Sequence, residues 1–147
     1  MKNELNNSNG ITQLNVYDNY KNTIVPKVKL LDILLKADCN EFDDVTTLNQ
    51  LLSIFELEKS YLEEVLYFLG KSSIDKELIF YLILNTNSNI SNIIKRELSC
   101  GSPNLYSPHD ISYIYQLDFN KVTQAFKFLN YKLITSYEIE LILFQLN

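Results

Sequence analysis

The sequence contains few of the residues that break helices: three glycines and three prolines in 147 residues. An all-β fold with many tight turns uses these residues more often, so their scarcity favours a mainly helical fold. Cys39 and Cys100 have no CxxC partner and no neighbouring histidine. We therefore expect reduced, packed thiols, with a disulfide between them as the alternative. The hydrophobic content of 46% is sufficient for one compact domain or two small ones.

Long hydrophobic runs are absent as well. The longest, from Leu78 to Leu84, is seven residues, whereas a helix needs roughly 20 to span a bilayer. The first ten residues, MKNELNNSNG, have no apolar stretch of the kind found in signal peptides. We therefore expect a soluble, cytoplasmic protein that does not contact membranes.

Histidine occurs once, at His109, with Ser107 and Asp110 close to it in the sequence. A nucleophilic triad needs residues that converge from separate elements, with a base within hydrogen-bond reach. Neighbours at the start of one helix do not converge in this way. We expect these residues to cap the helix.

Two pairs of adjacent carboxylates, Asp43-Asp44 and Glu63-Glu64, are the remaining candidates for a metal site or an acid/base couple. Adjacent residues on a helix diverge, and the first pair has the position of capping residues, so solvated charge is the favoured interpretation. The chain also lacks a Walker loop, a GxGxxG segment and an HExxH motif. We predict a protein that is not an enzyme and binds neither a metal nor a cofactor.

The net charge is −5, with a sequence pI near 4.8. A protein that binds nucleic acid indiscriminately would be basic, so this balance argues against such a role. The charge is unevenly distributed, however. From Asp118 to Lys132 there are three lysines and one aspartate, a local excess of positive charge in an acidic chain.

The stretch from Ser107 to Ile134 is predicted to form a helix, a tight turn and a second helix. A similar pattern lies 60 positions upstream without a gap. The matching positions are Phe55, Leu57, Glu58, Leu62, Val65, Leu66, Phe68, Leu69 and Ile74 in the first copy, and Tyr115, Leu117, Asp118, Val122, Ala125, Phe126, Phe128, Leu129 and Ile134 in the second. The predicted organisation is two helix-turn-helix units in tandem.

Apolar stripes and capping residues place the helices along both copies. They are expected from Pro26 to a break at Asp38, at Leu48–Phe55, at Glu58–Leu69, at Lys76–Leu84, at Ile90–Leu98, from Ser107-Pro108, and from Asp118 to Asn130. Ile11 to Tyr20 is expected to be a short strand or an extended arm. Tyr137 to Phe144 is predicted as a strand, with a helix as the alternative. The predicted domains are a flexible arm at 1–24, a first unit at 25–74 and a second unit at 75–147.

The second copy resembles the winged-helix form of helix-turn-helix proteins. The resemblance is carried by Asp110-Ile111-x-x-Ile114, Leu117, Val122, Ala125-Phe126, Phe128-Leu129 and Leu133-Ile134. Together with Asn104-Leu105-Tyr106-Ser107 and the helix at 77–84, the pattern is similar to the N-terminal domain of DnaD-type replication initiation proteins. It covers residues 76–134 well and 27–74 more loosely, and Lys132 stands where the family usually has glycine. The resemblance implies a mainly α chain of two winged-helix-like units, with a short β wing at the C-terminus and a role in replication or transcription.

In the helix at 118–130, the predicted register buries Val122, Ala125, Phe126 and Leu129. The outer face then consists of Asn120, Lys121, Thr123, Gln124 and Lys127. Asn, Gln and Lys side chains can reach base edges in the major groove, and lysine also meets phosphates. Double-stranded DNA is therefore the partner predicted for this face, with an ordinary solvated surface or a protein-docking surface as the alternative.

The corresponding helix of the first copy carries Glu63 and Glu64, which would repel phosphate. It also has aromatic side chains outside its buried stripe, a feature of interfaces, although the two units could bury them against each other. We expect this helix to bind a protein partner or a second copy of the chain in a dimer. The predicted protein-interaction residues are Tyr61, Glu63, Glu64, Tyr67 and Phe68.

The leading functional hypothesis is a small DNA-binding or DNA-associated regulatory protein. The alternative is an acidic protein-interaction module, an adaptor or inhibitor, that uses the same fold without DNA contact. Stacking of single-stranded bases on the aromatic residues is a weaker possibility, because no basic residues are interleaved with them.

Overall fold

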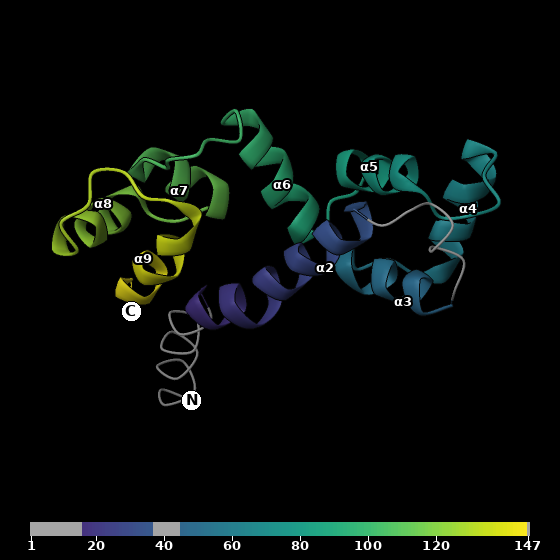
Figure 1. Ribbon diagram of the computed structural model, residues 1–147, viewed down its shortest axis with the longest axis horizontal. Helices are drawn as coiled ribbons and strands as arrows, with labels where there is room; N and C mark the ends of the chain where they lie inside the picture. The colour runs from purple at the N-terminus through teal and green to yellow at the C-terminus, as the bar shows by residue number, and fades with distance from the viewer. Residues whose placement is uncertain (1–15, 37–44, 147) are drawn as a thin grey trace, which may run out of the picture. The chain divides into compact units, whose positions relative to one another are not determined.

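The computed structural model of the chain describes residues 16–36 and 45–146, and it confirms the prediction of a mainly α fold (Figure 1). The named elements are η1 Tyr20–Ile24, α2 Val25–Lys36, α3 Val45–Ile54, α4 Lys59–Leu69, α5 Lys76–Asn85, α6 Asn89–Ser99, α7 Pro108–Tyr115, α8 Phe119–Phe128, η3 Ser136–Glu138 and α9 Ile139–Gln145. The predictions for residues 1–15, Asp38, Cys39 and Asp43-Asp44 lie outside the described residues. Within the described ranges, none of the helices has the length and apolar character needed to cross a membrane.

The chain divides into two compact units, one of residues Lys27–Lys95 and one of Met1–Pro26 with Arg96–Asn147. This division differs from the predicted boundaries after residues 24 and 74. The helix α5, which the sequence analysis assigned to the second unit, belongs with α3 and α4. Its buried side chains, Leu78, Ile79, Leu82 and Ile83, supply core to that unit.

Residues 16–24 are helical, so the interpretation of this segment as a strand or flexible arm is wrong for the part that the structure describes. The prediction that Pro26 opens a helix is wrong too, because helical backbone already precedes it. Proline has no N–H, and its ring clashes with the carbonyl four residues earlier. The helix widens at that point into the π-helical turn η1, in which the Val25 N–H donates to the Tyr20 carbonyl.

Three of the predicted helix starts are capped as expected. Asp75 accepts a hydrogen bond from the Leu78 N–H at the start of α5, and Asp118 accepts from the Lys121 N–H at the start of α8. Ser107 forms a reciprocal capping box with Asp110 at the start of α7. Each of these oxygens satisfies a backbone N–H that the helix itself leaves unpaired.

The predicted strand at Tyr137–Phe144 is wrong, because the segment forms η3 and α9. Ile139, Ile142 and Leu143 are buried, and their spacing of three and four places them on one helix face. Within residues 16–36 and 45–146 there is no strand that could form a β wing. The only β pairing there is an isolated antiparallel bridge between Tyr106 and Ile134.

In the structure the two copies match in backbone conformation as well as in apolar positions, and the match extends beyond Ile74 and Ile134. Glu56 and Gln116, 60 positions apart, both adopt left-handed backbone, with φ angles of 54° and 55°. The buried positions also correspond: Leu51 with Ile111, Ile54 with Ile114, Leu62 with Val122, Val65 with Ala125, Ile74 with Ile134, Ile79 with Ile139, Leu82 with Ile142, and Ile83 with Leu143. Because the last segment is helical in both copies, the repeat is more regular than the sequence analysis predicted.

Candidate nucleic-acid interface

The helix-turn-helix segment of the second copy consists of α7, a turn at residues 116–118, and α8. Gln116 adopts left-handed backbone, and the following Leu117 N–H donates to the Ser112 carbonyl at 2.9 Å, which ends α7. Buried Ile111 and Ile114 on α7 and Val122, Ala125 and Phe126 on α8 form the core beneath this turn. The packing fixes which face of α8 is turned outward.

A ring stack joins the N-terminal ends of α7 and α8. The His109 and Phe119 rings lie 4.3 Å apart between centroids, with an interplanar angle of 25°. His109 therefore packs across the turn. The prediction that it caps its own helix is wrong. The caps are Ser107, whose Oγ accepts from the Asp110 N–H, and Asp110, whose Oδ2 accepts from the Ser107 N–H.

The predicted DNA-binding residues lie on the outer side of α8, with one exception. Asn120, Lys121, Gln124 and Lys127 are exposed; we call these four residues the α8 surface. Thr123 is half-buried, and its Oγ1 donates to the Phe119 carbonyl at 2.8 Å. This hydroxyl is engaged within the helix, so Thr123 contributes less to the surface than predicted.

The lysines of the α8 region are not neutralised by neighbouring carboxylates. Lys121, Lys127 and Lys132 are exposed, and in the part of the chain that the structure describes none of them takes part in an ion pair. The nearby Asp118 uses its Oδ1 to cap α8. These three ammonium groups are therefore available to an anionic partner.

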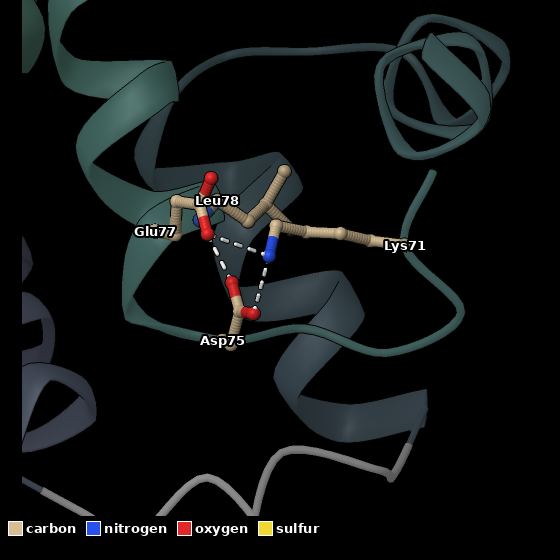
Figure 2. A network of polar contacts seen from close by, with 4 residues as sticks. All are labelled: Lys71, Asp75, Glu77 and Leu78. Atoms are coloured by element: carbon tan, nitrogen blue, oxygen red, sulfur yellow. Dashed lines mark hydrogen bonds and ion pairs between the residues drawn. The ribbon is translucent and has the colours of Figure 1, made fainter. Parts of the chain in front are cut away.

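In contrast, Lys71 of the first copy is engaged in ion pairs with neighbouring carboxylates (Figure 2). Its Nζ lies 2.6 Å from Asp75 Oδ2 and 3.0 Å from Glu77 Oε2, and its side chain is only 16% exposed. Asp75 Oδ1 also accepts from the Leu78 N–H at 2.9 Å. The ammonium group of Lys71 therefore stabilises the turn before α5 and is less available to a ligand than the lysines of α8.

The predicted protein-interaction residues lie on α4 and are all exposed. We call Tyr61, Glu63, Glu64, Tyr67 and Phe68 the α4 surface. The side chains of Tyr67 and Phe68 are 90% and 76% exposed. The one ion pair here joins Lys59 Nζ to Glu63 Oε1 at 3.9 Å, which leaves Glu64 outside any ion pair of the described residues.

The helices α4 and α8 are equivalent in the repeat, but their outward residues differ in chemistry. Tyr61 corresponds to Lys121, Glu63 to Thr123, Glu64 to Gln124, and Tyr67 to Lys127. The buried positions between them, Leu62 and Val65, correspond to Val122 and Ala125 and remain apolar. The same helix-turn-helix backbone thus has an acidic, aromatic surface on α4 and a cationic surface with amide side chains on α8.

A cluster of tyrosines holds the helical segment before Pro26 within the unit that contains α7–α9. Tyr17 donates to Glu140 Oε1 at 3.0 Å, and the Tyr20 and Tyr115 rings meet edge to face at 5.7 Å. The Tyr106 hydroxyl donates to the carboxylate of Glu97. Burial, then the nearby carboxylate, raises the pKa of Tyr106 well above its usual range. These tyrosines are structural, and they do not belong to the α8 surface.

Sequence reasoning missed the exposed side chains beyond α8. Tyr137 is 91% exposed and Leu133 is 49% exposed, near Lys132 in the chain. The sequence predicts Tyr137 at the start of a strand, and the alternation there does not indicate its exposure. The helical repeat, which aligns it with exposed Glu77, would have given that indication.

Comparisons of the chain with models of known protein families, with curated proteins and with solved structures found no match. Among the described residues, no three His, Cys, Asp or Glu side chains are grouped in a way that could hold a metal ion.

Proposed function

We propose that the protein binds double-stranded DNA through α8 and acts in the control of replication or transcription. The observation that carries the proposal is the α8 surface, on which unpaired lysines flank amide side chains on the second helix of a helix-turn-helix segment. The resemblance of residues 76–134 to winged-helix proteins supports the same proposal. In helix-turn-helix proteins it is this second helix that enters the major groove.

The residues of the α8 surface would have two roles in DNA recognition, base contact and phosphate contact. Asn120 and Gln124 carry amides, which can pair with the N6 and N7 edge of adenine in the major groove. Lys121 and Lys127 supply charge for phosphates, which positions the helix without reading sequence. The net charge of −5 on the whole chain would weaken contacts made anywhere else on its surface.

Fluorescence anisotropy titrations with mixed-sequence duplexes, at a series of salt concentrations, test the proposal. Lys121→Glu with Lys127→Glu is expected to abolish binding. Replacing both lysines by Gln should reduce the slope of log K against log salt by about two. A matched control is Lys29→Glu with Lys76→Glu, because these lysines are exposed on other helices and the charge change is identical. If no duplex binds at low salt, or if the two double variants behave alike, α8 does not contact DNA.

Base reading is tested separately from charge. Asn120→Ala and Gln124→Ala are expected to narrow the difference in affinity between preferred and random duplexes while leaving the salt dependence unchanged, because neither residue carries charge. A uniform loss of affinity for all duplexes would assign these residues a role in positioning only.

The alternative function is protein recognition without DNA, and the exposed aromatic residues of the α4 surface favour it. Tyr67→Ala with Phe68→Ala should then remove a stoichiometric protein partner that nuclease treatment does not affect. The α8 variants should leave that complex intact. Retention of the partner by the α4 variant would exclude this surface as its binding site.

A further inference from the structure

The α4 surface has the composition of a contact surface. Tyr67 and Phe68, which are consecutive in α4, are large aromatic side chains that are 90% and 76% exposed. Exposed apolar groups of this size are usually covered by a partner when they are grouped and bordered by charge. Glu63 and Glu64 supply that border, so the occupant of this surface should combine apolar and cationic groups.

The α8 surface, together with Phe128 at the end of the same helix, offers that combination within the same protein. Lys121 and Lys127 are exposed and unpaired in the described structure, and Phe128 beside them is 74% exposed. Lysine side chains can pack over tyrosine rings and pair with carboxylates. Equivalent positions of the repeat therefore hold complementary groups, with Tyr67 matching Lys127 and Tyr61 matching Lys121.

The charge pattern also discriminates between the ways in which two copies could meet. Two α4 surfaces brought together would oppose glutamates to glutamates, and two α8 surfaces would oppose lysines to lysines. Only an α4 surface against an α8 surface places opposite charges face to face. Repulsion in both like pairs selects the unlike pair, as in other specific interfaces.

We infer that the α4 surface of one copy binds the α8 surface of a second copy. Because each copy carries both patches, the contact can close reciprocally in a two-fold dimer, with α4 of each copy against α8 of the other, or repeat head-to-tail in larger rings or chains. A contact made by single helix faces is small, so it should be weak and sensitive to salt. The inference does not depend on DNA binding, but DNA bound to the α8 surface would compete with it.

Sedimentation velocity of the full chain without DNA, over a range of concentrations, tests the inference. The wild type should associate at low salt and dissociate at high salt. Lys121→Glu with Lys127→Glu, and separately Glu63→Lys with Glu64→Lys, should each weaken association by roughly tenfold or more. An equimolar mixture of these two variants should associate, because it again contains surfaces of opposite charge.

The quadruple variant, which combines both exchanges, is the decisive control. It keeps the net charge of −5 and restores opposite charges across the contact, so it should associate like the wild type. Its recovery would also show that the double variants lost association through charge and not through misfolding. A wild type that stays monomeric at low salt, or a quadruple variant that fails to recover, overturns the inference and leaves the α4 surface to an occupant of different chemistry.

Failure of the inference can be told apart from failure of the proposed function. In the quadruple variant the α8 surface is acidic, so it should associate and yet no longer bind duplex through α8. Self-association without any wild-type DNA binding would support the inference alone. Binding of duplex by a wild type that is always monomeric would support only the proposed function. If both hold, added duplex should dissociate the wild-type assemblies.

Discussion

Gly70 and Asn130 stand 60 positions apart and both hold left-handed backbone, with φ angles of 67° and 62°. Each follows the second helix of its repeat. The next residue donates its N–H back to the helix at 2.9 Å in both copies, from Lys71 to the Leu66 carbonyl and from Tyr131 to the Phe126 carbonyl. The same turn is thus built once with glycine and once with asparagine, the two residues that tolerate this conformation best.

Alanine at either position should therefore destabilise the protein. We expect Gly70→Ala to lower the free energy of unfolding by about 1–2 kcal/mol, because a left-handed residue with a Cβ is strained. Asn130→Ala should cost less, because asparagine already carries a Cβ and only its polar side chain, which favours this conformation, is lost. Apart from Gly70 and its two neighbours in the chain, no heavy atom would lie within 4 Å of an added Cβ, so the cost there comes from the backbone alone. Asn130→Gly should change stability by less than about 1 kcal/mol. Urea denaturation measures these differences, and equal stability of Asn130→Ala and Asn130→Gly would contradict the explanation.

The network around Lys71 and Asp75 predicts a pH dependence of stability. Desolvation alone would raise the pKa of Asp75, but hydrogen bonds from Lys71 and the Leu78 N–H, with the charge of Lys71, outweigh it and the pKa is lowered. A lowered pKa in the folded state means that the contribution is complete above the ordinary aspartate range. It is lost as pH falls from that range through the lowered value.

Asp75→Asn tests that contribution, because asparagine still caps a helix and only the charge is removed. The stability difference from the wild type should be largest near neutral pH and should vanish in acid. Asp75→Ala removes the cap as well and should cost about 1 kcal/mol more, at every pH. The hydrogen bonds of Lys71 to Asp75 and then to Glu77 raise the pKa of Lys71, so its contribution is complete at neutral pH and lost as pH rises through the raised value. A difference that stays constant from acid to neutral pH would show that the ion pair is not stabilising.

The stack of His109 on Phe119 should be measurable as a coupling energy. A double-mutant cycle of His109→Ala and Phe119→Ala, followed by chemical denaturation, is expected to give about 0.5–1.5 kcal/mol. Phe128→Ala is the control, because this exposed ring has no ring contact in the described structure. A coupling of zero would mean that the two rings only lie near each other.

Core substitutions should act within their own unit. Leu82 and Ile142 occupy equivalent positions and are fully buried, in different units. Replacing either by Ala should cost about 2–5 kcal/mol. Hydrogen exchange should locate the loss of protection mainly within residues 45–95 for Leu82→Ala and within 96–146 for Ile142→Ala. Leu84→Ala, at an exposed position of α5, should change little. Equal loss across both units would show that they unfold together.

Much of this fold could be predicted because local signals agree with each other. The stripe of Leu62 and Val65 and the caps at Asp75 and Asp118 specify helix faces and helix starts without help from the rest of the chain. Where a prediction rested on a single sequence feature, it was wrong. Pro26 suggested a helix start, since nothing local indicates that a helix continues through it, and the alternation at 138–141 suggested a strand over a segment of only a few residues.

The candidate site was predictable to the same degree. Helix periodicity gave the outward direction of Asn120, Lys121, Gln124 and Lys127, because that direction follows from what is buried. It could not give the bond from the Thr123 hydroxyl to its own helix. Nor could it give the stack of His109 on Phe119, because ring packing across a turn depends on three-dimensional approach that spacing does not encode.

The π-helical turn before Pro26 sets the direction in which the side chains of residues 16–20 point relative to Ile24. A wide turn accommodates one residue more than an ordinary one, and each residue of a helix advances the side-chain direction by about 100°. Removing a single residue between Tyr20 and Ile24 would restore a regular spiral. It would rotate Tyr17 and Tyr20, which contact Glu140 and Tyr115, by about 100° relative to Ile24 and Pro26 of the same unit. The number of residues between these tyrosines and Pro26 is therefore a determinant of this unit, in addition to the identity of the residues themselves.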